Sequence, residues 1–143
     1  MWSDPLVTRF IGGKPSTRDE TWSRLLRYAG LWSMLGFGYW LAEDRVSGKL
    51  LGEFGFGQWE RDITPKLELP EMGWALVPAA HGRGIATEGV KAALAWVDAH
   101  FKSEVTCIIS PQNTPSIRVA EKCGFREQTR TVFKGEPTII FRR

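Results

Sequence analysis

Apolar residues recur every three or four positions in three segments of the chain, and this spacing predicts three amphipathic helices. The first covers about Thr17 to Ala29, and either Ser16 or Thr17 can cap its amino end. The longest runs from Ile85 to Phe101, and the third runs from Ser116 to Cys123.

Short apolar runs between turn residues predict the strands. They are Tyr39–Ala42, Leu50–Phe56, Leu67–Val77, Val105–Ile109, Phe125–Phe133 and Pro137–Phe141. The first two flank Ser47-Gly48 and the last two flank Lys134-Gly135, so we expect two antiparallel hairpins. The order α-β-β-β-α-β-α-β-β predicts an α/β protein, and the length fits one domain over residues 1–143.

Composition adds little to the pattern and excludes several classes of protein. With 43% hydrophobic and 24% charged residues the chain is typical of globular proteins. The net charge of +3 is modest, and Lys and Arg are scattered among acids, so we do not expect a nucleic-acid partner. Cys107 and Cys123 match no zinc or redox spacing and are expected to be buried thiols.

No apolar run is long enough for a membrane span, and the amino terminus does not have the pattern of a secretory signal. We therefore expect a cytoplasmic protein without a membrane partner. His81 and His100 are too few and too far apart in sequence to indicate a metal site, so no metal is predicted.

The loop His81-Gly82-Arg83-Gly84 joins a predicted strand to the longest helix. The first turn of a helix presents unpaired N–H groups and about half a positive charge, and glycine lets an anion approach the backbone closely. Glycine spacing alone leaves a simple tight turn equally open. The Lys-Ser/Thr ending of an ATP loop and the third glycine of a dinucleotide fingerprint are both missing, so ATP and NAD are not expected.

Two segments resemble the motifs of the GNAT superfamily of N-acetyltransferases, with the RimJ/RimL-like branch as the closest match. The segment from Glu71 to Glu88 is similar to the acetyl-CoA motif: Gly84 and Ala86 match, and His81 stands where Gln or Arg is usual. The segment from Asn113 to Phe125 resembles the second motif, Asn-x-x-Ser/Ala ending in Lys-x-Gly-Phe.

The resemblance implies a single-layer mixed sheet flanked by helices, opened between the fourth and fifth strands of the family so that pantetheine lies in the gap. Family members usually begin with a strand upstream of the segment that Asp4 to Gly13 resembles. Either the true start lies further upstream, or the domain lacks that first strand. The next strand would then be an exposed edge, open to pairing with a second copy in a homodimer.

The resemblance also implies the residues that bind acetyl-CoA. Backbone groups of Trp74, Ala75 and Leu76 are expected to pair with pantetheine, and Asn113 is expected to meet the same arm. His81 is expected to be a cofactor-binding residue, and the pyrophosphate is expected on the N–H groups of Gly82, Arg83, Gly84, Ile85, Ala86 and Thr87. An N–H near Leu76 would stabilise the oxyanion formed during attack.

The residues that transfer protons are predicted with several alternatives. Glu71 is the first candidate for the general base, with Glu53 and Glu68 as alternatives, although a solvated or salt-bridged glutamate would explain each of them. Ala120 stands where many relatives have the Tyr that protonates the leaving thiolate. Ser116 is the nearest replacement, and a helix-capping role would explain the same hydroxyl.

The sequence thus predicts an acyltransferase that moves the acetyl group of acetyl-CoA to a primary amine without a metal. It does not name the acceptor: a peptide N-terminus is the first hypothesis, followed by a polyamine, an amino acid or an antibiotic amine. The alternative is a catalytically silent module that binds or senses acyl-CoA. A nucleic-acid-binding domain comes third.

Overall fold

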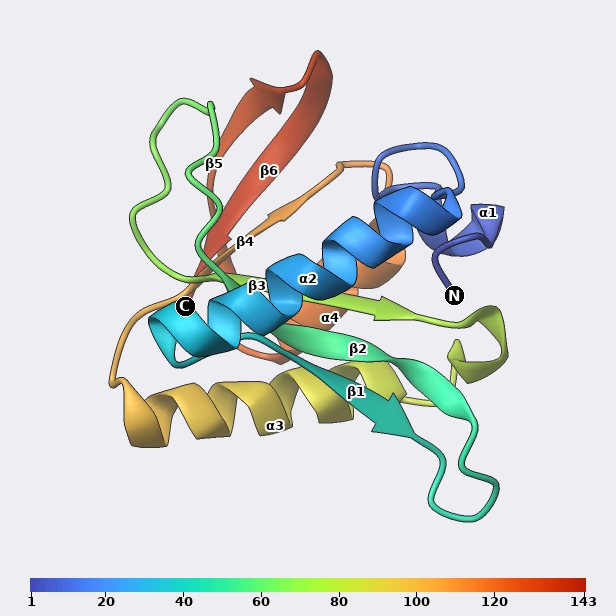
Figure 1. Ribbon diagram of the computed structural model, residues 1–143. Helices are drawn as coiled ribbons and strands as arrows, with labels where there is room; N and C mark the ends of the chain where they lie inside the picture. The colour runs from blue at the N-terminus through green and yellow to red at the C-terminus, as the bar shows by residue number, and fades with distance from the viewer.

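The computed structural model describes residues 1–143, and its centre is a six-stranded sheet with the strand order β1-β2-β3-β4-β6-β5 (Figure 1). The strands are β1 Tyr39–Glu43, β2 Leu50–Gly57, β3 Glu71–Leu76, β4 Thr106–Ile109, β5 Arg126–Phe133 and β6 Glu136–Arg142. Strands β3 and β4 are parallel, and every other neighbouring pair is antiparallel. The mixed sheet flanked by helices is therefore confirmed.

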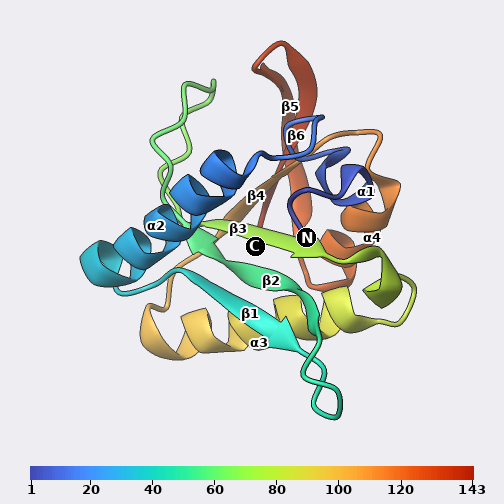
Figure 2. The same ribbon diagram turned by 45° about the vertical axis from the view of Figure 1, so that its right-hand side comes forward.

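Helices cover both faces of this sheet. They are α1 Pro5–Thr8, α2 Arg18–Leu35, the short 3-10 helix η1 Pro78–Ala80, α3 Ile85–His100 and α4 Thr114–Lys122. The two views show α2 lying across one face and α3 running along the other (Figures 1 and 2). The amino-terminal segment lies on the α2 side.

Alternation along the strands divides the side chains between these two faces. On β2, Phe54 and Phe56 point toward α3 and belong to the main core, whereas Glu53 points toward α2. The α3 side of that core is formed by Val90, Leu94 and other residues of one helix face. Each fully buried large apolar side chain contributes about 1.5–3 kcal/mol, so this face holds the fold together.

Helix α2 ends six residues later than the sequence pattern predicts. It passes through Gly30 and ends at Gly36, which adopts the left-handed conformation that glycine tolerates (φ 72°). Trp32 explains the extension, because its ring packs edge-on against Trp40 and Trp96 and its Nε1–H donates to the Tyr39 carbonyl (3.1 Å). Tertiary packing has overridden local propensity here.

Three smaller differences between the predicted and the observed elements have local causes. Strand β3 begins at Glu71 and not at Leu67, directly after Pro70, which has no N–H for a sheet ladder. Helix α4 begins at Thr114 because Asn113 is its cap. Helix α1 was not predicted; its amino end is capped by Asp4, whose side chain accepts from the backbone of the first turn.

Candidate active site

Strands β3 and β4 separate almost as soon as they meet. Glu71 opposite Thr106 is their only paired position, whereas β3 pairs with β2 along its whole length. Because the two strands run in parallel, the gap widens toward Leu76 and toward the loop that leads into α3. A linear ligand could lie in this gap and pair with strand backbone.

The amino end of α3 stands at the wide end of the gap and presents a run of unpaired backbone donors. The N–H groups of Gly82 to Thr87 donate to no backbone carbonyl, the first helical bond being that from Glu88 to Gly84, and no side chain caps the helix. Six consecutive donors next to a positive helix end suit a ligand with several anionic oxygen atoms.

Glycine is required in this loop by its conformation. Gly82 and Gly84 have φ of 71° and 80°, values that side chains with a Cβ rarely adopt. A Cβ built on either residue would meet no protein atom within 4 Å, so both face open space. The space is therefore available to a phosphate that approaches the backbone.

The backbone N–H groups of β3 point alternately toward β2 and toward the gap. Val77 N–H donates to the Leu51 carbonyl (3.0 Å), and alternation along an antiparallel ladder places the N–H of Ala75 on β2 as well. The N–H groups of Trp74 and Leu76 then point into the gap. Of the three strand residues that the sequence predicts for pantetheine, these two present their donors to it.

Asn113 and Ser116 lie at the start of α4, on the β4 side of the gap. Asn113 Oδ1 accepts from the Ser116 backbone N–H (3.3 Å), so Asn113 caps the helix and keeps its amide donors for a ligand. The capping role considered for the Ser116 hydroxyl is therefore wrong. Ala120 is fully buried in the core, so this position supplies no hydroxyl.

Glu71 lies at the narrow end of the gap and is engaged in an ion pair. The Arg61 guanidinium donates from Nε (2.6 Å) and from Nη2 (2.7 Å) to the two carboxylate oxygens. Both partners are largely shielded from solvent. The guanidinium occupies both carboxylate oxygens, so Glu71 as the general base remains a prediction here.

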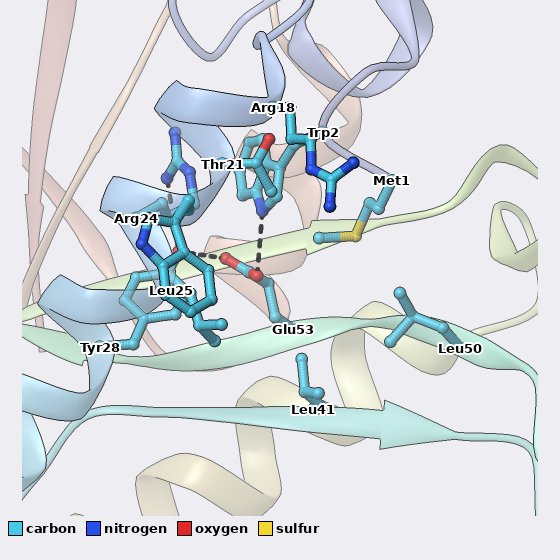
Figure 3. A pocket seen from close by; sticks show the side chains of 11 residues that line it. Met1, Trp2, Arg18, Thr21, Arg24, Leu25, Tyr28, Leu41, Leu50 and Glu53 are labelled. Carbon is cyan, nitrogen blue, oxygen red and sulfur yellow. Dashed lines mark hydrogen bonds between the residues drawn. The ribbon is translucent and has the colours of Figure 1, made fainter.

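Glu53 is the second buried acid, and it lies on the α2 face of β2 (Figure 3). Trp2 Nε1–H donates to Oε2 (3.2 Å), and the Tyr28 hydroxyl donates to Oε1. Burial raises the pKa of the Glu53 carboxyl, and these two hydrogen bonds oppose the shift. Burial and the charge of Glu53 in turn raise the pKa of Tyr28.

This shift gives stability a pH dependence that Glu53→Gln should remove. Because the folded state holds the proton more tightly than the unfolded chain, the free energy of unfolding should fall as pH rises from the ordinary carboxyl pKa of 4.5 through the raised value. Denaturant titrations between about pH 4 and about pH 8 would measure wild type against the variant. If wild type and variant differed in free energy of unfolding by the same amount at every pH, the raised pKa of Glu53 would be contradicted.

Sequence spacing could not have identified the residues around Glu53. Trp2 and Tyr28 lie 51 and 25 positions away from it, and nothing in their local sequence connects them. Glu68, the other alternative to Glu71, is exposed on the loop before β3. No group of three or more His, Cys, Asp or Glu side chains is arranged to hold a metal.

Both cysteines are free and buried, as the sequence predicts. Burial raises the pKa of both thiols.

None of the helices combines the length and apolar character that a membrane span requires.

Comparison with known proteins gives the following matches. The family model described as "Acetyltransferase (GNAT) domain" matches residues 1–126. A solved structure from Bordetella pertussis, assigned to the GnaT family of acetyltransferases, is 34% identical with a TM-score of 0.84, covering 93% of this chain and 81% of that one. The uncharacterized protein YkkB of Bacillus subtilis (strain 168) is 26% identical over 154 residues, covering all of this chain and 81% of the relative.

A further solved structure shares the fold and was determined with a ligand. It is a GNAT superfamily phosphinothricin acetyltransferase from Sinorhizobium meliloti in complex with AcCoA, 19% identical with a TM-score of 0.74. The match covers 99% of this chain and 80% of that one. At this level of identity the likeness shows the fold alone.

Proposed function

The chain belongs to the Acetyltransferase (GNAT) domain family, and we propose that it transfers the acetyl group of acetyl-CoA to a primary amine by direct attack. The observation that carries the proposal is the run of unpaired N–H groups from Gly82 to Thr87 at the wide end of the gap. The similar fold of a phosphinothricin acetyltransferase solved with AcCoA supports it. The segment from Glu71 to Glu88 favours the RimJ/RimL-like branch.

In this proposal acetyl-CoA runs along the gap with its pyrophosphate at α3. The loop donors and the positive helix end bind the phosphate oxygens, and the exposed Arg83 adds a cation. The pantetheine arm lies between β3 and β4, where the N–H of Trp74 and the side-chain amide of Asn113 are available to it. The acetyl group then lies near Leu76.

The reaction is aminolysis of a thioester. The amine lone pair attacks the carbonyl carbon, the C–N bond forms, and the C–S bond breaks with its electron pair leaving on sulfur. The N–H of Leu76 points into the gap and would stabilise the oxyanion, an effect of about 3 kcal/mol for one well-placed donor. Direct attack needs no covalent enzyme intermediate.

The leaving thiolate takes up a proton, although Ala120 stands at the position of the usual phenol. A thiol has a pKa of about 8.5, so protonation helps the departure of the thiolate but is not essential. The Ser116 hydroxyl donates to no protein atom and lies at the start of α4 beside the gap, which supports it as the donor.

A silent acyl-CoA-binding module is the second candidate, because the fully buried Ala120 leaves this chain without the usual proton donor. Purified protein should be mixed with acetyl-CoA and a panel of amines, and the appearance of thiol measured. We expect thiol release that depends on the amine. Tight binding of acetyl-CoA without amine-dependent release would identify the module instead.

A further inference from the structure

We propose that the pocket between α2, the amino-terminal segment and strands β1 and β2 binds the acceptor, and that Glu53 is the counter-ion and proton acceptor for its amine. The acceptor class is a primary ammonium on an apolar body with no second positive charge. The inference rests on the proposed acetyl transfer and names the substrate class of that reaction.

The pocket is large enough for such a ligand and has one acidic group. Its volume is about 630 Å³, within the range of small-molecule sites. Glu53 is its single acid, and the side chain lies on the floor of the pocket between Trp2 and Tyr28 (Figure 3). Only 4% of the residue is exposed, so a cation that reaches the carboxylate is largely withdrawn from water.

No cation lies within ion-pair distance of the Glu53 carboxylate, although the charges of Arg24 and of the amino terminus act on it from further away. The structure contains six ion pairs, and none involves this carboxylate. Arg24 lines the same pocket, but its guanidinium lies over the Trp2 ring, 3.7 Å from the ring centre. Glu71, the other buried acid, is paired with Arg61. A buried and unpaired charge is unfavourable for folding and is typical of a functional site.

The walls of the pocket define the rest of the ligand. Large apolar side chains surround the opening although they are more than half exposed: Leu41 is 64% exposed, Trp22 57% and Leu25 54%. Apolar side chains gathered around a cavity are typical of a binding surface. Arg18 and Arg24 line the pocket and the charged amino terminus acts on the one acid, and these cations disfavour a ligand with several positive charges.

The pocket lies one strand away from the gap that would hold the acetyl group. Glu53 is paired with Ala75, which lies between the two residues whose N–H groups point into the gap. Cα atoms of opposed residues in such a pair are about 5 Å apart. Trp2 packs on Ala75 and donates to Glu53, so one side chain contacts both the acid and the strand at the gap.

The proton balance follows from this arrangement. The bound ammonium gives one proton to the Glu53 carboxylate, and the resulting amine attacks the thioester carbonyl. As the amide forms, nitrogen loses a second proton, which goes to the departing thiolate. The products are the N-acetyl amine, the thiol of CoA and a protonated Glu53, which then releases its proton to water.

Turnover with two amines tests the inference. Phenethylamine is an apolar monocation and spermidine is a polar polycation; acetyl-CoA-dependent thiol release is measured with each. We expect kcat/KM for phenethylamine to exceed that for spermidine by at least about tenfold, since a second positive charge meets Arg18 and Arg24. The opposite preference would overturn the inference while leaving acetyl transfer intact. No release with any amine would count against the proposed function itself.

Variants at two glutamates test whether Glu53 is the residue that accepts the proton of the amine. Glu53→Gln should lower kcat/KM for phenethylamine by about 100-fold, the size expected for loss of a general base, with the affinity for acetyl-CoA unchanged. Glu43→Gln makes the same chemical change at an exposed position of β1 and should leave the rate unchanged. A Glu53→Gln variant as fast as wild type would overturn the inference.

Leu25→Arg keeps the test decisive if Glu53→Gln does not fold. Leu25 is on the outer part of the pocket wall, so the variant should fold, and its added cation should repel the ammonium. We expect the KM for phenethylamine to rise at least about tenfold with the affinity for acetyl-CoA unchanged. An unchanged KM would place the acceptor elsewhere.

Discussion

Gly84→Val is expected to lower the affinity for acetyl-CoA by about 100-fold. Gly84 has a φ of 80°, and a β-branched residue avoids that conformation, so the variant should rearrange the loop from which the unpaired N–H groups point. Losing two hydrogen bonds to charged oxygens, at about 1.5 kcal/mol each, corresponds to about 100-fold in affinity. Isothermal titration of the purified proteins with acetyl-CoA measures it.

Gly135→Val is the matched control for this change. Gly135 has a φ of 82° and, like Gly84, no neighbouring atom where a Cβ would be, but it lies in the turn between β5 and β6. Both variants should lose a similar amount of folding free energy, about 1–2 kcal/mol. Only Gly84→Val should lose affinity for acetyl-CoA. Equal affinities for the two variants would show that the loop is not the binding site.

Glu71→Ala is expected to destabilise the fold by about 3 kcal/mol, because it leaves the guanidinium of Arg61 largely buried without its partner. The pair joins the loop between β2 and β3 to the narrow end of the gap, so its loss should also loosen the start of β3. For a chain of this size the melting temperature should fall by about 10 °C. Thermal and denaturant unfolding measure the change.

Glu127→Ala provides a comparison with the same chemistry at the surface. Its partner Arg130 donates from Nε at 2.7 Å, against 2.6 Å in the buried pair, but both side chains are largely exposed. The exposed pair should contribute less than about 1 kcal/mol. If Glu71→Ala lost no more folding free energy than Glu127→Ala, the structural role of the Glu71–Arg61 pair would be contradicted. A loss of turnover without a loss of stability would instead favour Glu71 as the general base.

The candidate acetyl-CoA site could be proposed from the sequence because it is built from contiguous residues. The strand, the glycine loop and the first turn of the helix follow one another between Glu71 and Glu88. Their chemistry depends on backbone N–H groups, glycine conformation and the helix end, which are local properties. The same locality explains why Thr17 and Glu20, three residues apart, form the capping box of α2.

The extent of α2 shows where local reasoning stops. Gly30 marks a break in the sequence pattern, yet the helix continues because Trp32 packs on Trp40 and Trp96 from two other elements. The paired state of Glu71 is similar, because Arg61 comes from a loop whose path no local pattern predicts. In both cases the partner is distant in sequence.

By itself the sequence determined the order of the elements apart from α1 and η1, and the mixed sheet through its family resemblance; it also predicted the loop from Gly82 to Thr87 as an anion site. Only the tertiary structure distinguished the two buried acids, leaving Glu71 paired and Glu53 unpaired at the floor of a pocket. The physical reason is that backbone donors at a helix end arise from neighbours in the chain. The environment of a buried carboxylate arises from Trp2 and Tyr28, which only folding brings to it.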